Sequence, residues 1–147
     1  YHERFQPQTL AQYHSAVATM WNLLDRNIEA QCNRSRCPGT PYGYMRPAQL
    51  EHYSSFVWQM GEMTYCEIGF NGGHSAAAML SASPALIVHS FDLMMWGYSN
   101  ASASLLKTQF GQRFVLHAGD SKVQVPRWTR QAPGACDLLF VDGNLMT

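Results

Sequence analysis

Charged residues are scarce in this sequence, and no block of basic residues stands out. Only 14% of the 147 residues are charged, and ten Lys and Arg residues balance ten Asp and Glu residues. A surface that binds nucleic acid needs clustered cations to neutralise phosphates, so nucleic acid is not expected as a partner. The low charge leaves much of the surface apolar or neutral, and we therefore expect something absent from this chain to cover part of it.

Long apolar runs are also missing. No stretch approaches the roughly 18 residues that a membrane-spanning helix needs, so no membrane span is predicted. The sequence has no signal-peptide pattern, but it begins at Tyr1 rather than Met, so this absence says nothing about an upstream segment. Hydrophobic residues make up 46% of the chain, which predicts a globular protein with a core of its own.

Cysteine is limited to four residues. Cys32 and Cys37 enclose a short polar loop, where a local disulfide would indicate an oxidising compartment and two free thiols a reducing one. Residues 33–35 and 100–102 are N-glycosylation sequons, which agree with a secretory or lumenal location; the alternative is the cytoplasm. Two neighbouring thiols fall short of the four ligands that zinc takes. The other cysteines lie in apolar strand-like runs and are expected to be small buried residues: Cys66 and Cys136.

Hydrophobic spacing indicates helices first and strands later. Apolar residues at three- and four-residue steps predict an amphipathic helix over residues 8–30. After a loop at 32–46, a second helix is predicted from Pro47 to near Gly61. Beyond it, short apolar runs alternate with helical segments, with strands at 64–68, 86–91, 113–118 and 137–141 and helices at 74–80 and 100–110. Residues 121–134 stay open, because Pro126 limits a helix there. This alternation predicts an α/β fold, a Rossmann-like parallel sheet with helices on both faces.

Each predicted strand ends on polar or glycine residues. The first strand is followed by the Gly-rich turn 69–73, the second ends on Asp92, the third leads into Gly119-Asp120 and the fourth into Asp142-Gly143. The carboxyl ends of parallel strands share one edge of the sheet, and ligands bind there. One such residue alone would be ordinary loop sequence, but four on one edge indicate a bound small molecule.

The spacing of these residues narrows the ligand. Asp92 lies 23 positions beyond Gly69, where a carboxylate can accept hydrogen bonds from both hydroxyls of a ribose. A nicotinamide cofactor would bind its ribose to the same kind of carboxylate. However, Asn71 stands at the position of the second glycine of the dinucleotide-binding motif Gly-x-Gly-x-x-Gly, which lets the backbone approach the pyrophosphate. An NAD-binding oxidoreductase is therefore disfavoured. S-adenosylmethionine, which has no pyrophosphate, is favoured.

Four segments together resemble a known family. Residues 66–76, CEIGFNGGHSA, resemble the first motif of class I S-adenosylmethionine-dependent methyltransferases. Residues 90–92 (SFD), 117–121 (HAGDS) and 140–143 (FVDG) resemble their later strand-end motifs, in the same order. The likeness covers about residues 62–143 and is greatest to the small-molecule or O-methyltransferase-like branch. Because that family has seven strands and four are found here, we expect a partial Rossmann-like cofactor-binding domain at 62–147, preceded by an N-terminal helical segment at 1–61.

The resemblance implies S-adenosylmethionine as cofactor and methyl transfer to an unidentified small-molecule acceptor. It places eight residues around the cofactor: Glu67, Gly69, Asn71 and Gly73 at its methionine and ribose, Asp92 at the ribose hydroxyls, Asp120 and Ser121 at the adenine, and Asp142 near the reacting methyl or the methionine end. It identifies no catalytic base. The further ligands of metal-dependent relatives would fall beyond Thr147, so no metal is predicted.

Some alternatives stay open. The chain is either a methyltransferase half or a non-catalytic cofactor-binding or interaction module that uses a free sheet edge for a partner. His74 either contacts substrate or is a polar residue at a helix start. Trp96 and Tyr98 either wall the adenine or pack on the helices. Replacement of Asp92 by Ala is expected to weaken cofactor binding with little change in melting temperature, since Asp92 is predicted to lie on a rim.

Overall fold

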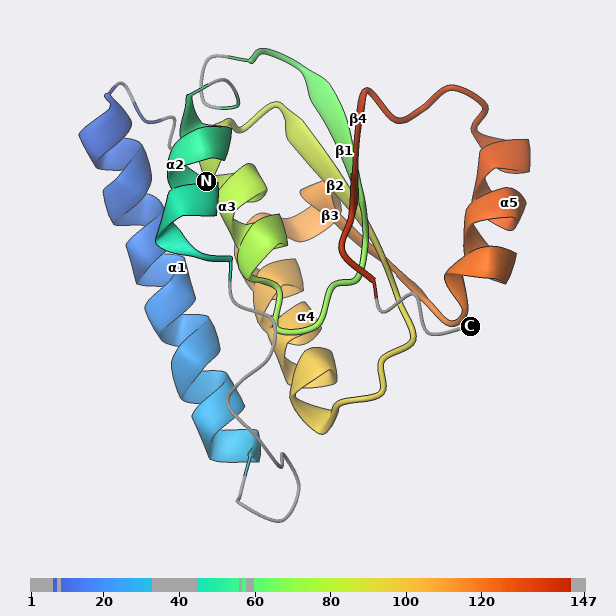
Figure 1. Cartoon of the computed structure of the whole chain (residues 1–147), viewed down its shortest axis with the longest axis horizontal. Helices are drawn as coiled ribbons and strands as arrows, with labels where there is room; N and C mark the ends of the chain where they lie inside the picture. Colours follow the sequence, from blue (N-terminus) through green and yellow to red (C-terminus); the bar gives the residue numbers. More distant parts are fainter. Residues whose placement is uncertain (1–6, 8, 33–44, 56, 58–59, 144–147) are drawn as a thin grey trace.

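The sheet is built from four parallel strands in the order β3-β2-β1-β4. The computed structural model describes residues 7, 9–32, 45–55, 57 and 60–143. The strands are β1 (Met63–Ile68), β2 (Leu86–Asp92), β3 (Phe114–Ala118) and β4 (Leu138–Val141), and all four run in one direction (Figure 1). The predicted α/β fold with a parallel sheet is confirmed, and the predicted strand limits agree within one residue.

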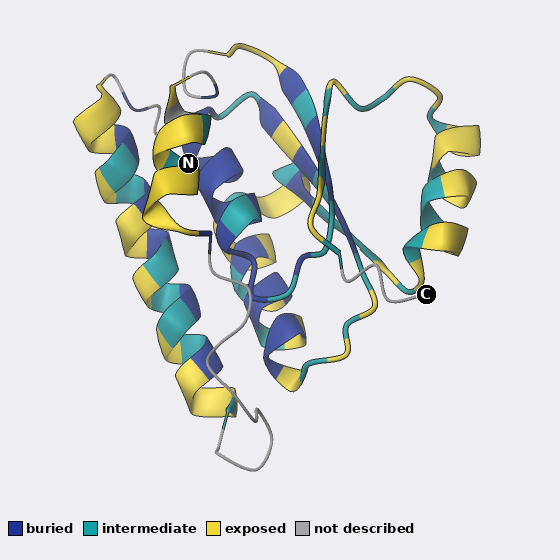
Figure 2. Ribbon diagram, in the orientation of Figure 1, coloured by how far each residue is buried: buried dark blue, intermediate teal, exposed yellow. Residues whose placement is uncertain are grey.

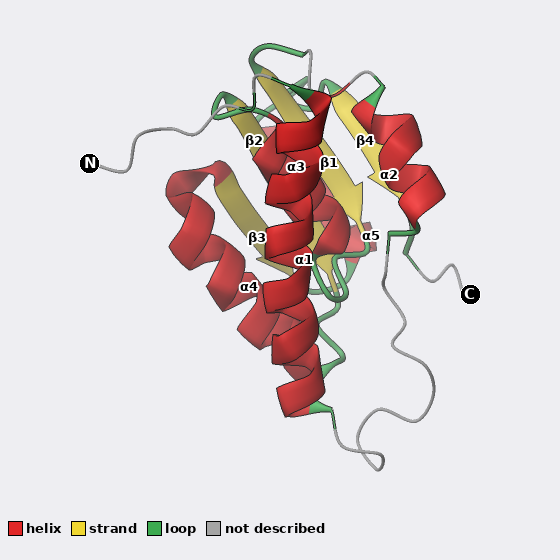
Figure 3. Ribbon diagram, turned by 90° about the vertical axis from the view of Figure 1, so that its left-hand side faces the viewer, coloured by secondary structure: helices red, strands yellow, loops and turns green. Residues whose placement is uncertain are grey.

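The helices cover the two faces of the sheet unequally. They are α1 (Leu10–Gln31), α2 (Pro47–Ser54), α3 (His74–Ala82), α4 (Gly97–Phe110) and α5 (Ser121–Gln131), and a 3-10 turn, η2, follows α4 at Gly111–Arg113. One face is covered by α3 and α4, with α1 packed outside them, whereas α5 lies against the other face (Figure 1). α2 lies beside β4, where the ring of Tyr53 contacts that of Phe140 (Figure 3).

α1 is amphipathic, as its sequence predicts. Its buried side chains recur at three- and four-residue steps and form the stripe that Figure 2 shows in dark blue: Tyr13, Val17, Met20, Leu24 and Ile28. This stripe joins the same hydrophobic core as the sheet. The hydroxyl of Tyr13 donates to the backbone carbonyl of Ala78 on α3, which supplies the polar partner that a buried phenol needs. Residues from both predicted segments, 1–61 and 62–147, contribute to one hydrophobic core. Their division into two domains stays a prediction.

One helix prediction needs correction, and the structure decides one segment that the sequence left open. α2 ends at Ser54 and not near Gly61. Residues 121–131 form a helix with Pro126 inside it, although proline has no N–H for the carbonyl four residues earlier. Trp128, in the same turn of the helix, offsets this loss because its ring packs against His89, with ring centroids 4.6 Å apart, and against His117. Tertiary packing therefore decides the segment that sequence left open.

His89 and His117 lie side by side between the sheet and α5. Nδ1 of His89 is 2.9 Å from Nε2 of His117, so one ring donates and the other accepts. Burial and the neighbouring His117 lower the pKa of His89 to about 4, and burial also lowers the pKa of His117. Both rings are therefore neutral at physiological pH and pack as aromatic groups.

The prediction that two cysteines are simply buried residues is wrong in one respect. Cys66 of β1 is buried, but it forms a disulfide with Cys136, just before β4, with their Cα atoms 5.9 Å apart. No cysteine in the described ranges is free. The predicted Cys32–Cys37 pair includes Cys37, which lies outside the described residues, although Cys32 itself is disulfide-bonded.

β4 forms one side of the four-stranded sheet. Its side chains on the α5 face are at least half exposed, with Leu139 at 58% and Val141 at 50%, and Ile87 of β2 is 40% exposed on the same face. The α5 face of the sheet therefore carries exposed apolar side chains on β2 and β4. Within the part of the chain that the structure describes, no helix has the length and apolar character to cross a bilayer.

Candidate functional site

The four strand ends meet along the lower edge of the sheet in Figure 1, and backbone hydrogen bonds link them there. The N–H of Gly69 donates to Phe91 across 2.8 Å, and that of Gly119 donates to Asp92 across 2.8 Å. The N–H of Asp142 donates to Ile68 across 2.9 Å. The Gly-rich turn, Asp92, Gly119 and Asp142 therefore belong to one continuous rim, as the parallel arrangement predicts.

Glycine is required at two points of the Gly-rich turn. Gly69 has φ +103°, and a Cβ there would lie 2.9 Å from the backbone nitrogen of Gly143. Gly73 has φ +85° and precedes α3, and a Cβ there would lie 2.8 Å from the ring of Phe70. A side chain at either position would force backbone or an aromatic ring to move. The turn is thus held close against β4 on one side and α3 on the other.

Asp92 is the residue that binds the turn to β2. Its Oδ2 accepts from the backbone N–H groups of Phe70 and Asn71, at 2.8 and 3.0 Å, and its Oδ1 accepts from Met94 at 2.6 Å. The carboxylate therefore faces the Gly-rich turn. Three donors leave lone pairs available on the carboxylate, so this half-buried group can still accept from a ligand.

Asn71 links the turn to α4. It has a positive φ of 47°, and its Oδ1 accepts from the hydroxyl of the buried Tyr98 across 2.5 Å. Asn71 thus occupies a left-handed conformation that Asn tolerates better than most residues. Tyr98 packs inside the protein, so of the two alternatives for this residue the structure shows packing, with the hydroxyl used to hold the turn. Trp96 stacks against it and is half-buried.

Glu67 lies behind the rim and not on it. Its side chain is 0% exposed, and its carboxylate accepts from Ser75 at 2.6 Å and from Ser90 at 2.7 Å. A weaker contact of 3.4 Å comes from the hydroxyl of Tyr65. Glu67 thus joins β1 to β2 through Ser90 and to α3 through Ser75. A carboxylate in an apolar strand needs hydrogen-bonding partners, but the sequence did not indicate these serines.

Burial controls the charge of Glu67. It raises the pKa of the carboxyl from 4.5 to about 7, because removing a carboxylate from water disfavours the ionised form. The hydrogen bonds from Ser75, Ser90 and Tyr65 act in the opposite direction, and Asp92 raises the pKa slightly. Glu67 is therefore poised between its neutral and ionised forms near neutral pH.

The other predicted residues differ in how they are held. Asp120 is the N-cap of α5, and its Oδ1 accepts from the N–H of Lys122 at 2.8 Å. It is exposed, as is Asp142, and Ser121 is half-buried. The side chains of Asp120 and Ser121 make no contact with the Gly-rich turn among those described, so their ligand roles stay predictions. Of the eight predicted residues, only Glu67 and Gly73 are fully buried.

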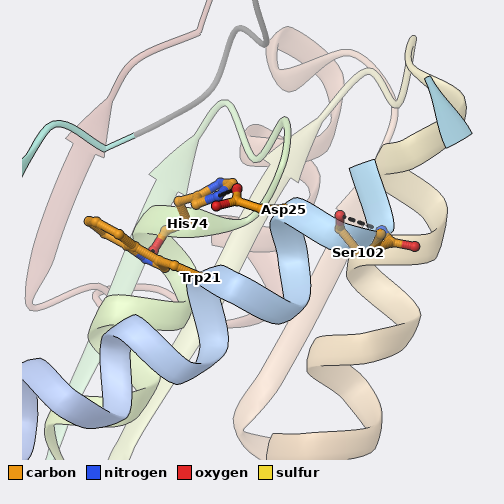
Figure 4. A network of polar contacts seen from close by, with 5 residues as sticks. Trp21, Asp25, His74 and Ser102 are labelled. Carbon is orange, nitrogen blue, oxygen red and sulfur yellow. Dashed lines mark hydrogen bonds and ion pairs between the residues drawn. The ribbon is translucent and has the colours of Figure 1, made fainter. Parts of the chain in front are cut away.

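α1 is tied to the start of α3 by polar contacts that the sequence did not indicate. Nε2 of His74 lies 2.9 Å from Oδ1 of Asp25, and Nε1 of Trp21 donates to the backbone carbonyl of His74 (Figure 4). His74 is only 1% exposed. It therefore supports the end of the Gly-rich turn from inside the fold, which favours the structural alternative for this residue over contact with substrate.

An exposed apolar loop follows Asp92. Leu93 is 59% exposed and Met95 is 74% exposed, and both lie between the ribose-binding candidate and α4. Such a loop suits the flat face of a base.

Within the described residues, no group of three or more His, Cys, Asp or Glu side chains is placed to hold a metal ion. The absence of a metal stays a prediction.

Comparisons with known proteins agree with this arrangement. A sequence model described as a methyltransferase domain matches residues 66–146, more than half of the chain. No curated protein matches. The structure of the O-methyltransferase from Bacillus cereus in complex with SAH is similar to 89% of this chain and 63% of its own, with TM-score 0.65 and 15% identity. A protein-L-isoaspartate O-methyltransferase is similar to 88% of this chain and 47% of its own, with TM-score 0.51 and 13% identity. These likenesses show the fold, and the chain spans less than two thirds of either protein.

Proposed function

Since the chain belongs to the methyltransferase domain family, we propose that its strand-end rim binds S-adenosylmethionine and that the whole protein methylates a small molecule. The observation that carries this proposal is Asp92, whose carboxylate is fixed by three backbone N–H groups beside the Gly-rich turn. A ligand with a ribose diol would find an immobile acceptor there. The O-methyltransferase with the similar fold was crystallised with S-adenosylhomocysteine (SAH).

This proposal gives the residues of the rim separate roles in binding the cofactor. Asp92 would accept from the ribose hydroxyls, and Gly69 and Asn71 would present backbone to the methionine end. Glu67 would act from behind the rim, by holding Ser75 and Ser90 and hence the ends of α3 and β2. Asp120 and Ser121 would meet the adenine, with Leu93 and Met95 as an apolar wall.

Methyl transfer makes few demands on the protein beyond position. The cofactor supplies an electrophilic methyl group on a sulfonium, and the acceptor atom must lie in line with it, about 3 Å away, with water excluded. In our proposal, the rim of this chain would hold the cofactor side of that arrangement. We propose that the acceptor and any base are held by parts of the whole protein outside this chain, which covers 63% of the similar O-methyltransferase.

Calorimetric titration with SAH and with NAD tests the cofactor. SAH is expected to bind the chain or its parent protein, and NAD is not, because Asn71 replaces the glycine that a pyrophosphate needs. Asp92→Asn keeps the shape and removes the charge, and Glu62→Gln, at an exposed position away from the rim, is the matched control. Equal affinity for SAH in wild type and Asp92→Asn would contradict the role of Asp92.

A second function is favoured by a specific observation. The exposed side chains of Leu139 and Val141 on the outer strand form a surface suited to a partner, as an interaction module would require. A parent protein that binds SAH but transfers no methyl group to any of a panel of phenols, amines and carboxylic acids would support this second function over the first.

We also propose a secretory or lumenal location. The Cys66–Cys136 disulfide supports it, because such bonds persist mainly in oxidising compartments. Mass mapping of non-reduced peptides from protein of the native source tests it. Free thiols at both positions would point to the cytoplasm instead.

A further inference from the structure

The outer side of α4 is a polar stripe. Asn100, Ser104 and Thr108 recur at four-residue steps and are all exposed. The Ser104 hydroxyl donates to the carbonyl of Asn100, and the Thr108 hydroxyl donates to that of Ser104, both across 3.0 Å. The hydroxyls are thus satisfied within the helix, and no exposed apolar side chain of the stripe calls for a protein partner. A bulky, solvated group attached to Asn100 would meet only water.

The sequon that contains Asn100 is split between the two sides of this helix. Ser102 is 0% exposed, and its Oγ accepts from Nδ2 of Asn27 across 3.0 Å (Figure 4). An enzyme that recognises Asn-x-Ser must reach the hydroxyl as well as the amide. In the folded protein the amide side is accessible and the hydroxyl is enclosed between α4 and α1. Modification of this sequon must therefore precede the formation of α4.

We propose that Asn100 carries an N-linked glycan, added before α4 folds. A bond forms between Nδ2 of Asn100 and the anomeric carbon of an oligosaccharide supplied as a lipid-linked diphosphate. The bond from that carbon to the phosphate oxygen breaks, the diphosphate leaves with the electron pair, and the amide nitrogen loses one proton. This inference rests on the proposed oxidising compartment but not on methyl transfer.

The geometry also indicates what the glycan does. Once α4 has folded, the sugar projects from the polar stripe, opposite the side of α4 that packs in the core through Leu106. Asn100 is the fourth residue of α4, so the sugar is attached at the end of the helix that follows the rim loop. Its effect is to keep this face hydrated in a chain with few charges.

The experiment uses the chain secreted from a eukaryotic cell behind an added signal. Digestion with a peptide N-glycosidase, an amidase that hydrolyses the side-chain amide linking the sugar to the asparagine, is expected to shift the wild type on a gel, and to leave an acid at position 100 that mass spectrometry identifies. Asn100→Gln is expected to lose that shift, whereas Ser102→Thr, which keeps the sequon, retains it. Asn33→Gln separates any contribution of the second sequon.

The outcomes test the glycan separately from the compartment. Secreted protein with an intact Cys66–Cys136 disulfide and an unmodified Asn100 overturns the glycan. The added signal imposes the compartment in this experiment, so the compartment is tested separately, by mass mapping of protein from the native source. The timing is tested by adding microsomes either during translation or to folded, unmodified protein. Modification is expected only during translation, and modification of the folded protein overturns the argument from the burial of Ser102.

Discussion

Replacing Glu67 by Gln tests whether burial or hydrogen bonding dominates behind the rim. The folded-state pKa of this carboxyl, about 7, lies above its ordinary value of 4.5, so the folded protein binds more protons than the unfolded chain between these values. The stability contributed by protonated Glu67 is therefore fully present below pH 4.5 and is lost as the pH rises through 7. At 1.36 kcal/mol for each pH unit, the loss is roughly 3 kcal/mol.

The amide that Glu67→Gln introduces cannot be charged, yet it has nearly the shape of the acid and can still bond to hydroxyls. We expect Glu67→Gln to match the wild type at pH 4.5 and to be more stable by about 3 kcal/mol at pH 8. The assay is urea unfolding of both proteins from pH 4.5 to 8. Glu62→Gln, at an exposed position, is the control and should change little at any pH.

Other groups titrate in the same pH range. The test is therefore the difference in unfolding free energy between wild type and Glu67→Gln at each pH, and not the pH dependence of either protein alone. The pKa of His89 is lowered to about 4, and the unfolded chain therefore binds more protons at this site between pH 4 and 6.5. That makes stability rise with pH, opposite to Glu67, but equally in wild type and variant. A constant difference across the pH range, or a less stable variant at pH 8, would refute the reasoning. The second result would show that the bonds from Ser75 and Ser90 outweigh burial.

Three further predictions follow from the rim and the disulfide. Asp92→Asn should weaken SAH binding about tenfold in calorimetry. It should also lower the free energy of unfolding by about 1–3 kcal/mol, because three backbone N–H groups lose a charged acceptor. An unchanged melting temperature would support the expectation from sequence that Asp92 is a rim residue with no structural role. Tyr98→Phe should cost about 1 kcal/mol in denaturant unfolding and weaken SAH binding by more than Tyr53→Phe does, since Tyr98 and not Tyr53 holds Asn71. Cys136→Ser should lower the unfolding free energy by about 4 kcal/mol, because the lost crosslink spans 70 residues; equal stability with and without the bond would contradict this.

The sequence by itself determined the parallel sheet and the positions where its strands end. Those features are local: an apolar run followed by Asp or Gly marks a strand and the point where it ends, as at Asp92 and Asp142. Alternation with helices makes the strands parallel, and parallel strands bring their carboxyl ends to one edge. The rim residues can therefore be named from the order of residues along the chain.

Tertiary structure alone decided what stands behind that rim. Ser90 reaches Glu67 because the parallel register of β1 and β2 sets them opposite each other, 23 residues apart in sequence. Cys136 reaches Cys66 because β4 returns to the free side of β1 after 70 residues. α5 continues through Pro126 because Trp128 finds aromatic partners on the sheet. Each of these depends on a distance between distant segments, which spacing along the chain does not specify and the packing of the sheet does.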